Sequence, residues 1–323
     1  MRYYLFYTLL LFSVTIATAR TALACDFCMM HQGISPLETL NGAGIRVTQR
    51  YTRLDSVYQG TNEIHNPGAT EEFWTTDISG FYSVTKGLLL MANIPFRVTH
   101  GDGDVSTAPG GGVDLETDTG GDTGIGDISL LARYTFFHRH TLDSTLLFAV
   151  TGGMKLPTGS TDARTDDGDE FLDAHTQLGT GSFDGLLGFG FNYARGRVAF
   201  SGNVLGAING DGEFGNTDHR FGNTINYDLT GRYRLFPGTI GQSSTQVFMS
   251  LGLVGEARGR EEEDGEDVYD SGGQTVYIAP GLQINFAGHW VTELSYQHAV
   301  HHDLNGTQLG EDYKIFGSVT YLF

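Results

Sequence analysis

The sequence contains twelve segments in which apolar and polar side chains alternate residue by residue. In the last of them Tyr313, Ile315 and Val319 fall on one face, whereas Lys314 and Thr320 fall on the other. Successive side chains of a β-strand point to opposite sides, so this period of two predicts strands with one apolar and one polar environment. The segments cover residues 43–55, 72–84, 88–99, 127–137, 144–156, 183–193, 197–209, 223–236, 246–258, 274–286, 290–300 and 312–323.

The connections between these segments are alternately short and long. The short ones are 85–87, 138–143, 194–196, 237–245 and 287–289, and the long ones are 56–71, 100–126, 157–182, 210–222, 259–273 and 301–311. An even number of strands with short turns at one end and long loops at the other is typical of bacterial outer-membrane barrels. The sequence therefore predicts an all-β fold, an antiparallel up-and-down transmembrane β-barrel of about 12 strands.

The N-terminus predicts export. Arg2 precedes an apolar run over residues 5–19, and Ala22, Leu23 and Ala24 form the small-x-small pattern that signal peptidase cleaves. The run is shorter than the ~20 residues that a membrane-spanning helix needs. We expect a signal peptide over residues 1–24, a periplasmic segment over 25–41 and the barrel over 42–323, with the mature chain in the bacterial outer membrane.

A soluble β-sandwich is the alternative fold, because its strands also alternate. The chain has 46 Gly, 21 Phe and 15 Tyr but only 7 Pro, and aromatic residues such as Trp74, Tyr134 and Tyr233 lie near the strand ends. Such aromatic residues form girdles at the two surfaces of a membrane, and a sandwich gives no reason for six long loops on one side. Both observations favour the membrane barrel.

The expected partners follow from this fold. A net charge of −19 disfavours nucleic acid as a partner. The last strand ends in Phe323, as is typical of chains that the barrel-insertion machinery recognises. We therefore expect contacts with that machinery, with outer-membrane lipid and lipopolysaccharide, and with a small-molecule solute.

Charged residues gather on the predicted inner face. Asp184 and Asp312 lie there, and closely spaced charges are expected to pair across the interior because an isolated buried ion is costly. Two interpretations remain open: a narrow charge-lined passage for small solutes, and a salt-bridged plug that holds the barrel shut. The predicted pore-lining residues are Arg46, Arg50, Asp77, Arg97, Arg133, Lys155, Asp228, Arg232, Arg234, Glu256, Glu293 and Lys314.

Four motifs in the chain carry a resemblance to a known family. They are TGIGD at 123–127, GMKLPTG at 153–159, QLGTGS at 177–182 and APGLQ at 279–283. Together they resemble the outer-membrane transporter family named for the meta-cleavage pathway of phenol degradation, over about residues 120–323. The resemblance implies a barrel that passes aromatic or other small hydrophobic compounds.

The predicted mature N-terminus carries a group of soft ligands: Cys25, Cys28, Met29, Met30 and His31. Thiols, thioethers and an imidazole suit Cu(I). A disulfide or redox dithiol is a second interpretation, because the compartment is oxidising. Lipid attachment at Cys25 is a third, and the sequence does not decide among them.

Other metal ligands are suggested more weakly. Acidic runs at 114–122, 162–173 and 261–270 lie in predicted external loops and can hold Ca²⁺, although none has EF-hand spacing and solvated loops are the alternative. His298, His301 and His302 with Asp303 are candidate ligands for Zn²⁺ at the base of one loop. The predicted function needs no cofactor, so Cu and Ca²⁺ are candidate ligands only.

The sequence shows no nucleophile elbow, paired-histidine zinc motif or phosphate loop, and we expect no enzymatic activity. The predicted function is a porin-like channel that passes small organic solutes passively, aromatic or hydrophobic ones included. The alternative is a binding or scaffold protein whose N-terminal segment holds a metal or takes part in redox chemistry. A hydrolase on the lipid-facing surface is a third hypothesis, with little support because the outward faces carry almost no serine–histidine pair.

Overall fold

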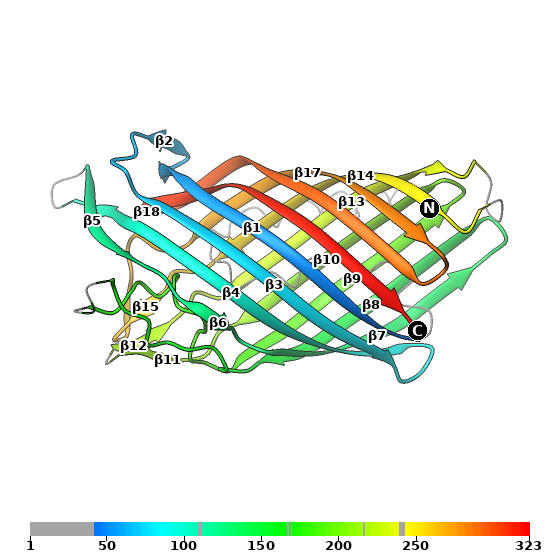
Figure 1. Ribbon diagram of the computed structural model, residues 1–323, viewed down its shortest axis with the longest axis horizontal. Coiled ribbons are helices and arrows are strands. Elements are labelled where there is room, and N and C mark those ends of the chain that lie inside the picture. The colour runs from blue at the N-terminus through cyan, green and yellow to red at the C-terminus, as the bar shows by residue number, and fades with distance from the viewer. Residues whose placement is uncertain (1–41, 109–111, 167, 169, 216, 239–242) are drawn as a thin grey trace, which may run out of the picture.

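The alternating segments form long β-strands (Figure 1). The computed structural model describes residues 42–323, except 109–111, 167, 169, 216 and 239–242. Within these residues all the regular secondary structure is β-strand. They are β1 (Ala43–Gly60), β2 (Asn62–Ile64), β3 (Thr70–Ser83), β4 (Leu88–Thr107), β5 (Val113–Gly120), β6 (Thr123–Ile125), β7 (Ser129–His140), β8 (Ser144–Lys155), β9 (Asp184–Arg195), β10 (Val198–Ile208), β11 (Gly212–Phe214), β12 (Thr217–Arg220), β13 (Thr224–Phe236), β14 (Gln246–Arg258), β15 (Glu262–Glu263), β16 (Glu266–Asp267), β17 (Gly273–Phe286) and β18 (Trp290–Leu322).

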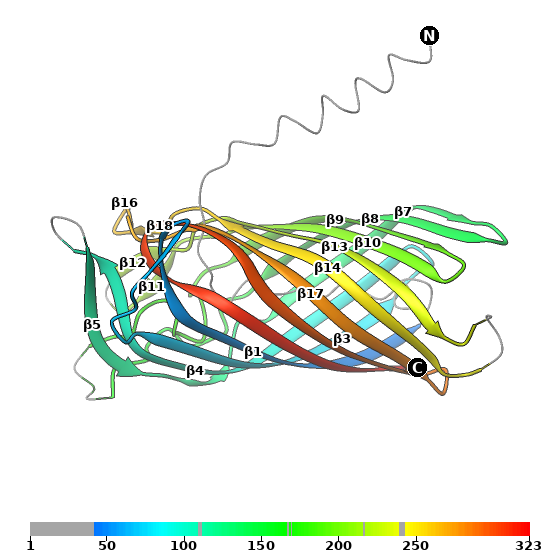
Figure 2. The same ribbon diagram turned by 90° about the horizontal axis from the view of Figure 1, so that it is seen from above.

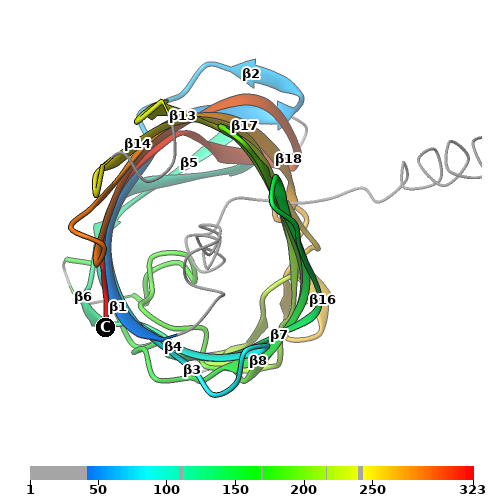
Figure 3. The same cartoon turned by 90° about the vertical axis from the view of Figure 1, so that its right-hand side faces the viewer.

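Eleven of these strands form a closed antiparallel ring. Their order is β18, β17, β14, β13, β10, β9, β8, β7, β4, β3 and β1, and β1 pairs back with β18. Viewed along its axis, the sheet is one continuous wall (Figure 3). A closed sheet satisfies the backbone hydrogen bonds of every strand in the wall, as the hydrocarbon core of a membrane requires. The predicted all-β barrel is confirmed.

The last strand, β18, crosses the wall twice. Its first part, residues 290–304, pairs with β17, and its second part, residues 304–322, pairs with β1. Gly306 lies at the reversal with a φ of 58°, a left-handed conformation that favours glycine. The rings of Trp290 and Tyr321 lie 4.8 Å apart and connect the two parts. Because β18 crosses twice, the eleven strands make the twelve crossings expected from the sequence. Most of residues 301–311, predicted as a loop, belong to β18.

The short turns and the long connections lie at opposite ends of the barrel (Figures 1 and 2). The turns after β3, β7, β9, β13 and β17 are at the end that holds the C-terminus, and β2, β5, β11 and β12 are at the other. In outer-membrane barrels the short turns face the periplasm. The external connection predicted at 100–126 is shorter than expected, because β4 continues to Thr107 and pairs with β5 and β6.

Burial is the reverse of that in a soluble protein. The outward side chains Ile45 and Leu251 are 47% and 61% exposed, whereas the inward side chains Arg46 and Lys314 are 8% and 0% exposed. Leaving one large apolar side chain in water costs about 1.5–3 kcal/mol, and the wall exposes many of them. A soluble sandwich is therefore wrong for this chain, and a lipid environment fits its outer wall.

Aromatic rings mark the external edge of this apolar belt. The Tyr51 ring lies 4.6 Å from the Trp74 ring and 6.0 Å from the Tyr313 ring. One step farther along the same outward faces, Arg53 Nη1 lies 2.7 Å from Glu72 Oε1. Aromatic residues prefer the membrane surface and charged pairs prefer water, so the belt ends between these two layers.

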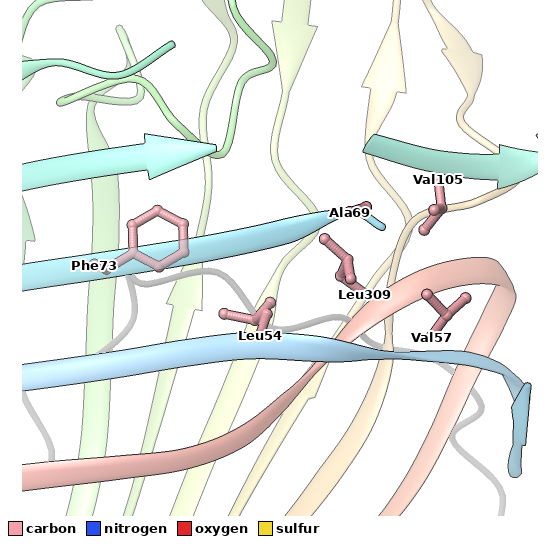
Figure 4. Close-up of a cluster of buried hydrophobic side chains, with 6 residues drawn as sticks. All are labelled: Leu54, Val57, Ala69, Phe73, Val105 and Leu309. Carbon is pink, nitrogen blue, oxygen red and sulfur yellow. The ribbon is translucent and has the colours of Figure 1, made fainter. Parts of the chain in front are cut away.

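Beyond this girdle the interior changes from polar to apolar. Register shifts between Arg53 and Leu54 and between Leu54 and Ser56 bend β1 where it pairs with β18. A β-bulge changes the face on which the following side chains lie, so the simple alternation does not predict the cluster. Its buried residues are Leu54, Val57, Ala69, Phe73, Val105 and Leu309 (Figure 4).

Candidate functional site

An ion cluster is buried inside the barrel between three neighbouring strands. Lys314 Nζ of β18 lies 2.8 Å from Glu256 Oε1 of β14 and also pairs with Glu311. The hydroxyl of Tyr277 on β17 donates a hydrogen bond to Glu311, and Lys314 Nζ lies 4.7 Å from the centre of the Tyr277 ring. All four side chains are buried. Buried charges persist only when they are paired, so the cluster holds β14, β17 and β18 together.

A second ion cluster is centred on Lys155 at the end of β8. Its Nζ lies 3.6 Å from Asp127 Oδ2 and also pairs with Asp184 at the start of β9. Asp127 Oδ1 accepts hydrogen bonds from the backbone N–H groups of Thr158, at 3.1 Å, and Gly159, at 3.0 Å. The cluster therefore fixes both ends of the connection between β8 and β9.

This connection, residues 156–183, folds into the barrel (Figure 3). Arg97 Nη1 on β4 donates to the carbonyl oxygens of Gln177, at 2.8 Å, and Leu178, at 3.2 Å. The hydroxyl of Thr99 donates to the carbonyl of Thr176 at 2.7 Å, and Gln177 is fully buried. Inward side chains of the wall thus bind the loop backbone, and the loop narrows the interior.

The structure places the twelve residues predicted to line a pore on the inner side of the wall, and nine of them are buried. Asp77, Arg232 and Glu293 are half-buried and contact other inward side chains. Their contacts are Asn93 Nδ2 to Asp77 Oδ1 at 2.9 Å, Arg232 Nη1 to the Ser201 hydroxyl at 3.3 Å, and Arg46 Nη2 to Glu293 Oε2 at 3.6 Å.

One acid of the lumen differs from the sequence prediction. Alternation places Asp312 beside Lys314, but the register shift in β18 skips residue 312, so Glu311 faces Lys314 instead. Asp312 accepts hydrogen bonds from the backbone N–H of Asp55 at 2.8 Å and the hydroxyl of Ser56 at 2.6 Å. A strict period of two contains no signal for a bulge, so the sequence could not identify Glu311.

A cavity of about 590 Å³ lies at the external end. The apolar side chains Leu54, Val105 and Leu309 form part of its wall, and loop residues around Asp173 and Glu261 form another part. Seven carboxylate side chains and no Lys or Arg line it among the described residues. Cavities of this size hold small organic ligands.

Glu261 links three external connections at this cavity. Its Oε1 lies 3.0 Å from His175 Nε2, its Oε2 lies 3.1 Å from His219 Nε2, and Asp173 Oδ1 lies 3.3 Å from His175 Nδ1. Burial alone raises the pKa of Glu261, but the charges and hydrogen bonds of the two histidines overcome it and hold that pKa well below its usual range. This cluster could not be predicted from the sequence, because its members come from separate loops.

The proposed metal ligands Cys25, Cys28, Met29, Met30 and His31 lie outside the described residues. Of the other candidates, His298 and His301 are exposed, whereas His302 is buried, its Nε2 3.0 Å from the Glu311 carbonyl oxygen. In the part of the chain that the structure describes, no three His, Cys, Asp or Glu residues are arranged to hold a metal ion. Nor does that part contain a helix long and apolar enough to cross a membrane.

Comparison with known families adds to this geometry. The sequence model of the family described as "MetA-pathway of phenol degradation" matches residues 53–311. The chain belongs to this family. The resemblance expected from the four motifs is thus confirmed, and it extends farther toward the N-terminus than those motifs. No curated protein matches the sequence of this member of the phenol-degradation family.

The chain is also similar to several solved structures. The COG4313 outer membrane channel from Pseudomonas putida F1 is 15% identical, covers 90% of this chain and 100% of its own, and has a TM-score of 0.65. The β domain of the Bordetella autotransporter BrkA is 14% identical over 88% and 100% of the chains, with a TM-score of 0.43. The transport unit of the Escherichia coli autotransporter AIDA-I is 9% identical over 98% and 97%, with a TM-score of 0.44. The first of these supports the fold, and this family member is an outer-membrane β-barrel located in the bacterial outer membrane.

Proposed function

We propose that this member of the phenol-degradation family is a channel that passes small organic solutes across the outer membrane by passive diffusion. The observation that carries the proposal is the distribution of charge on the closed ring: Arg46 and Lys314 face inward and Ile45 and Leu251 face outward. A wall of this kind separates a polar interior from lipid. The similarity to a barrel described as an outer membrane channel supports the same role.

The route that fits this geometry starts in the external cavity. The 156–183 loop and the Lys155 and Lys314 clusters then narrow the interior. Paired charges in a constriction select solutes by size and polarity, so the passage admits small solutes rather than polymers. The buried ion pairs are in this proposal part of the selective passage and not a permanent plug.

Transport rather than catalysis is the role that the inward residues support. The ion pairs fix loops and strands, and we propose no chemical step for them. The C-terminal aromatic strand and Phe323 are proposed to engage the barrel-insertion machinery, and the outer wall to contact lipid and lipopolysaccharide. The alternative role of a metal-binding scaffold rests on residues 25–31, outside the described part, and stays a prediction.

Single-channel recording in a planar bilayer tests the proposal. Purified, folded protein should produce discrete current steps in simple salt, whereas the same protein after heat denaturation should produce none. Liposomes that contain the folded protein should swell in small sugars and small aromatic solutes but not in oligosaccharides. A folded barrel that gives neither current steps nor swelling contradicts the proposed function.

A further inference from the structure

The external cavity contains a buried carboxyl group that has no hydrogen-bond or ion-pair partner in the described barrel. Glu71 of β3 lines the cavity, and 7% of its surface is exposed. It lies past the Tyr51–Trp74 girdle, outside the apolar belt. Across the residues that the structure describes, no hydrogen bond and no ion pair reaches its side chain. A buried carboxyl group with no partner in the wall is free to bind a hydrogen-bond donor or a cation that enters the cavity.

A second buried acceptor in the cavity also lacks a donor. Gln308 lines the cavity and is 2% exposed. Its Nε2 donates to the carbonyl oxygens of Gly272, at 3.1 Å, and Asn305, which fixes the orientation of the amide. Its Oε1 has no hydrogen-bond partner within the described residues. Buried polar atoms are normally paired, so this acceptor and the partnerless carboxyl group of Glu71 favour a ligand that brings hydrogen-bond donors.

The charge of the cavity selects the sign of that ligand. Seven carboxylates line it, Asp104 and Asp173 among them, and among the described lining residues the basic ones are His175 and His219. Both histidines face the same carboxylate, Glu261. A concave surface lined by one sign of charge focuses the field and concentrates ions of the opposite sign. The cavity therefore favours cations and repels anions.

The apolar part of the cavity wall favours a ligand that also has an apolar body. Leu54, Val105 and Leu309 line the cavity and belong to the buried cluster at the external end (Figure 4). A simple metal ion gains nothing from such a surface, whereas an alkyl or aryl group is stabilised by leaving water. The ligand that fits carries both a cationic N–H group and an apolar body.

The geometry points to a binding site for a small organic cation, a protonated primary amine on an apolar body, with its ammonium group at Glu71 and its body against Leu54, Val105 and Leu309. The inference names the solute class of the proposed channel and rests on that function only for its physiological role, because binding itself needs no conduction. A charge-assisted hydrogen bond from the ammonium to a buried carboxylate is among the stronger polar contacts.

The protonation of Glu71 should make ligand binding at this site depend on pH. Burial raises the pKa of Glu71 to about 8; His175 opposes this rise, and Asp104, Asp173 and Glu311 add to it. The empty site therefore carries a neutral acid below that pH, and a bound cation favours the ionised form and releases a proton. Affinity for an amine should fall roughly 50- to 100-fold between about pH 8.5 and about pH 6.

Isothermal titration of the full-length protein in detergent tests the site. The probe is benzylamine, which is protonated over this pH range, and the comparison compounds are neutral benzyl alcohol and anionic benzoate. We expect benzylamine to bind most tightly at about pH 8.5, and the heat of binding at lower pH to vary with the ionisation enthalpy of the buffer. Equal or tighter binding of benzyl alcohol or benzoate overturns the proposal.

The variant Glu71→Gln has the shape of the protonated acid and no titrating group. It should lower the affinity for benzylamine at about pH 8.5 at least tenfold, and it should remove the release of a proton. The control is Glu72→Gln on the opposite face of β3, where the carboxylate pairs with Arg53, and it should bind benzylamine as the wild type does. Folding of each variant is checked by its heat-dependent gel mobility. A folded Glu71→Gln protein with unchanged affinity overturns the assignment.

Conductance of the same preparations separates this inference from the proposed function. Current steps without preferential binding of benzylamine leave the channel in place and remove the amine site. Preferential binding without current steps supports the amine site and removes the channel.

Discussion

Lys314 and Glu256 are 58 residues apart in the chain, yet their side chains meet inside the barrel with Nζ 2.8 Å from Oε1. Glu256 lies on β14 and Lys314 on the second crossing of β18, and β17 and the first crossing of β18 separate them in the ring. The ion pair therefore spans two intervening crossings, and it does so where both side chains are buried. Such a pair is strongly coupled to the closure of the wall, because either charge alone would be costly.

Removal of the lysine tests this coupling. Lys314→Met leaves Glu256 and Glu311 without their buried cation, and we expect a loss of about 3–5 kcal/mol in the free energy of unfolding. The measurement is urea unfolding of protein refolded in lipid vesicles. Lys86→Met, in the exposed turn after β3, is the matched control and should change little. Equal losses in the two variants would show that the buried pair has no special role.

Arg97 is expected to control the width of the interior. Arg97→Ala removes the donors that hold the carbonyls of Gln177 and Leu178, with an expected cost of about 1.5–3 kcal/mol for the loop. We expect a larger single-channel conductance and faster protease cleavage within residues 156–183. Arg195→Ala, at the exposed end of β9, is the control. A folded Arg97→Ala protein with wild-type conductance would contradict a narrowing role for this loop.

The contact of Glu261 with two histidines predicts an effect of acid on the external loops. The pKa of Glu261 is held below its ordinary value of 4.5 in the folded protein. A lowered carboxyl pKa contributes stability that is complete above the ordinary value and is lost as the pH falls toward the folded value. The hydrogen-exchange protection factors of the amides around His175 and His219, which correct for the intrinsic exchange rate, should therefore fall between about pH 5 and about pH 3.

Two variants separate this effect from general acid sensitivity. Glu261→Gln should give fast exchange in these loops already at neutral pH and a flatter pH profile. Glu263→Gln, whose side chain is exposed, should keep the wild-type profile. A Glu261→Gln profile that matches the wild type would assign the acid response to other carboxylates.

The stability cost of a charged substitution should depend strongly on whether the substituted residue faces lipid. Leu251 lies in the middle of β14 and is 61% exposed on the outer wall. Leu251→Arg should destabilise the folded barrel by about 2–4 kcal/mol, because a charge in the apolar belt is poorly solvated. Leu142→Arg makes the same substitution in the exposed turn after β7 and should cost little. Denaturation of both variants in vesicles measures the difference, and equal stability would place Leu251 outside the hydrocarbon region.

Much of the barrel can be predicted from residues that are near each other in the chain. The alternation around Lys314 and Ile315 sets which face of the strand is apolar, and the short and long connections set the count of crossings. The inward placement of Arg46, Arg97 and Lys155 follows from the same alternation. These predictions hold because a strand has one local geometry, and its period does not depend on distant neighbours.

The candidate site depends on contacts for which the sequence has no periodic signal. The bulge that turns Glu311 rather than Asp312 toward Lys314 arises where β18 pairs with β1, more than 250 residues away. The meeting of Glu261 with His175 and His219, and the burial of Glu71 without a partner, occur only when separate external connections close over the barrel. Local chemistry establishes a membrane barrel with a polar interior, whereas the charge and shape of its external cavity arise from long-range packing, because burial and pairing are properties of neighbours in space.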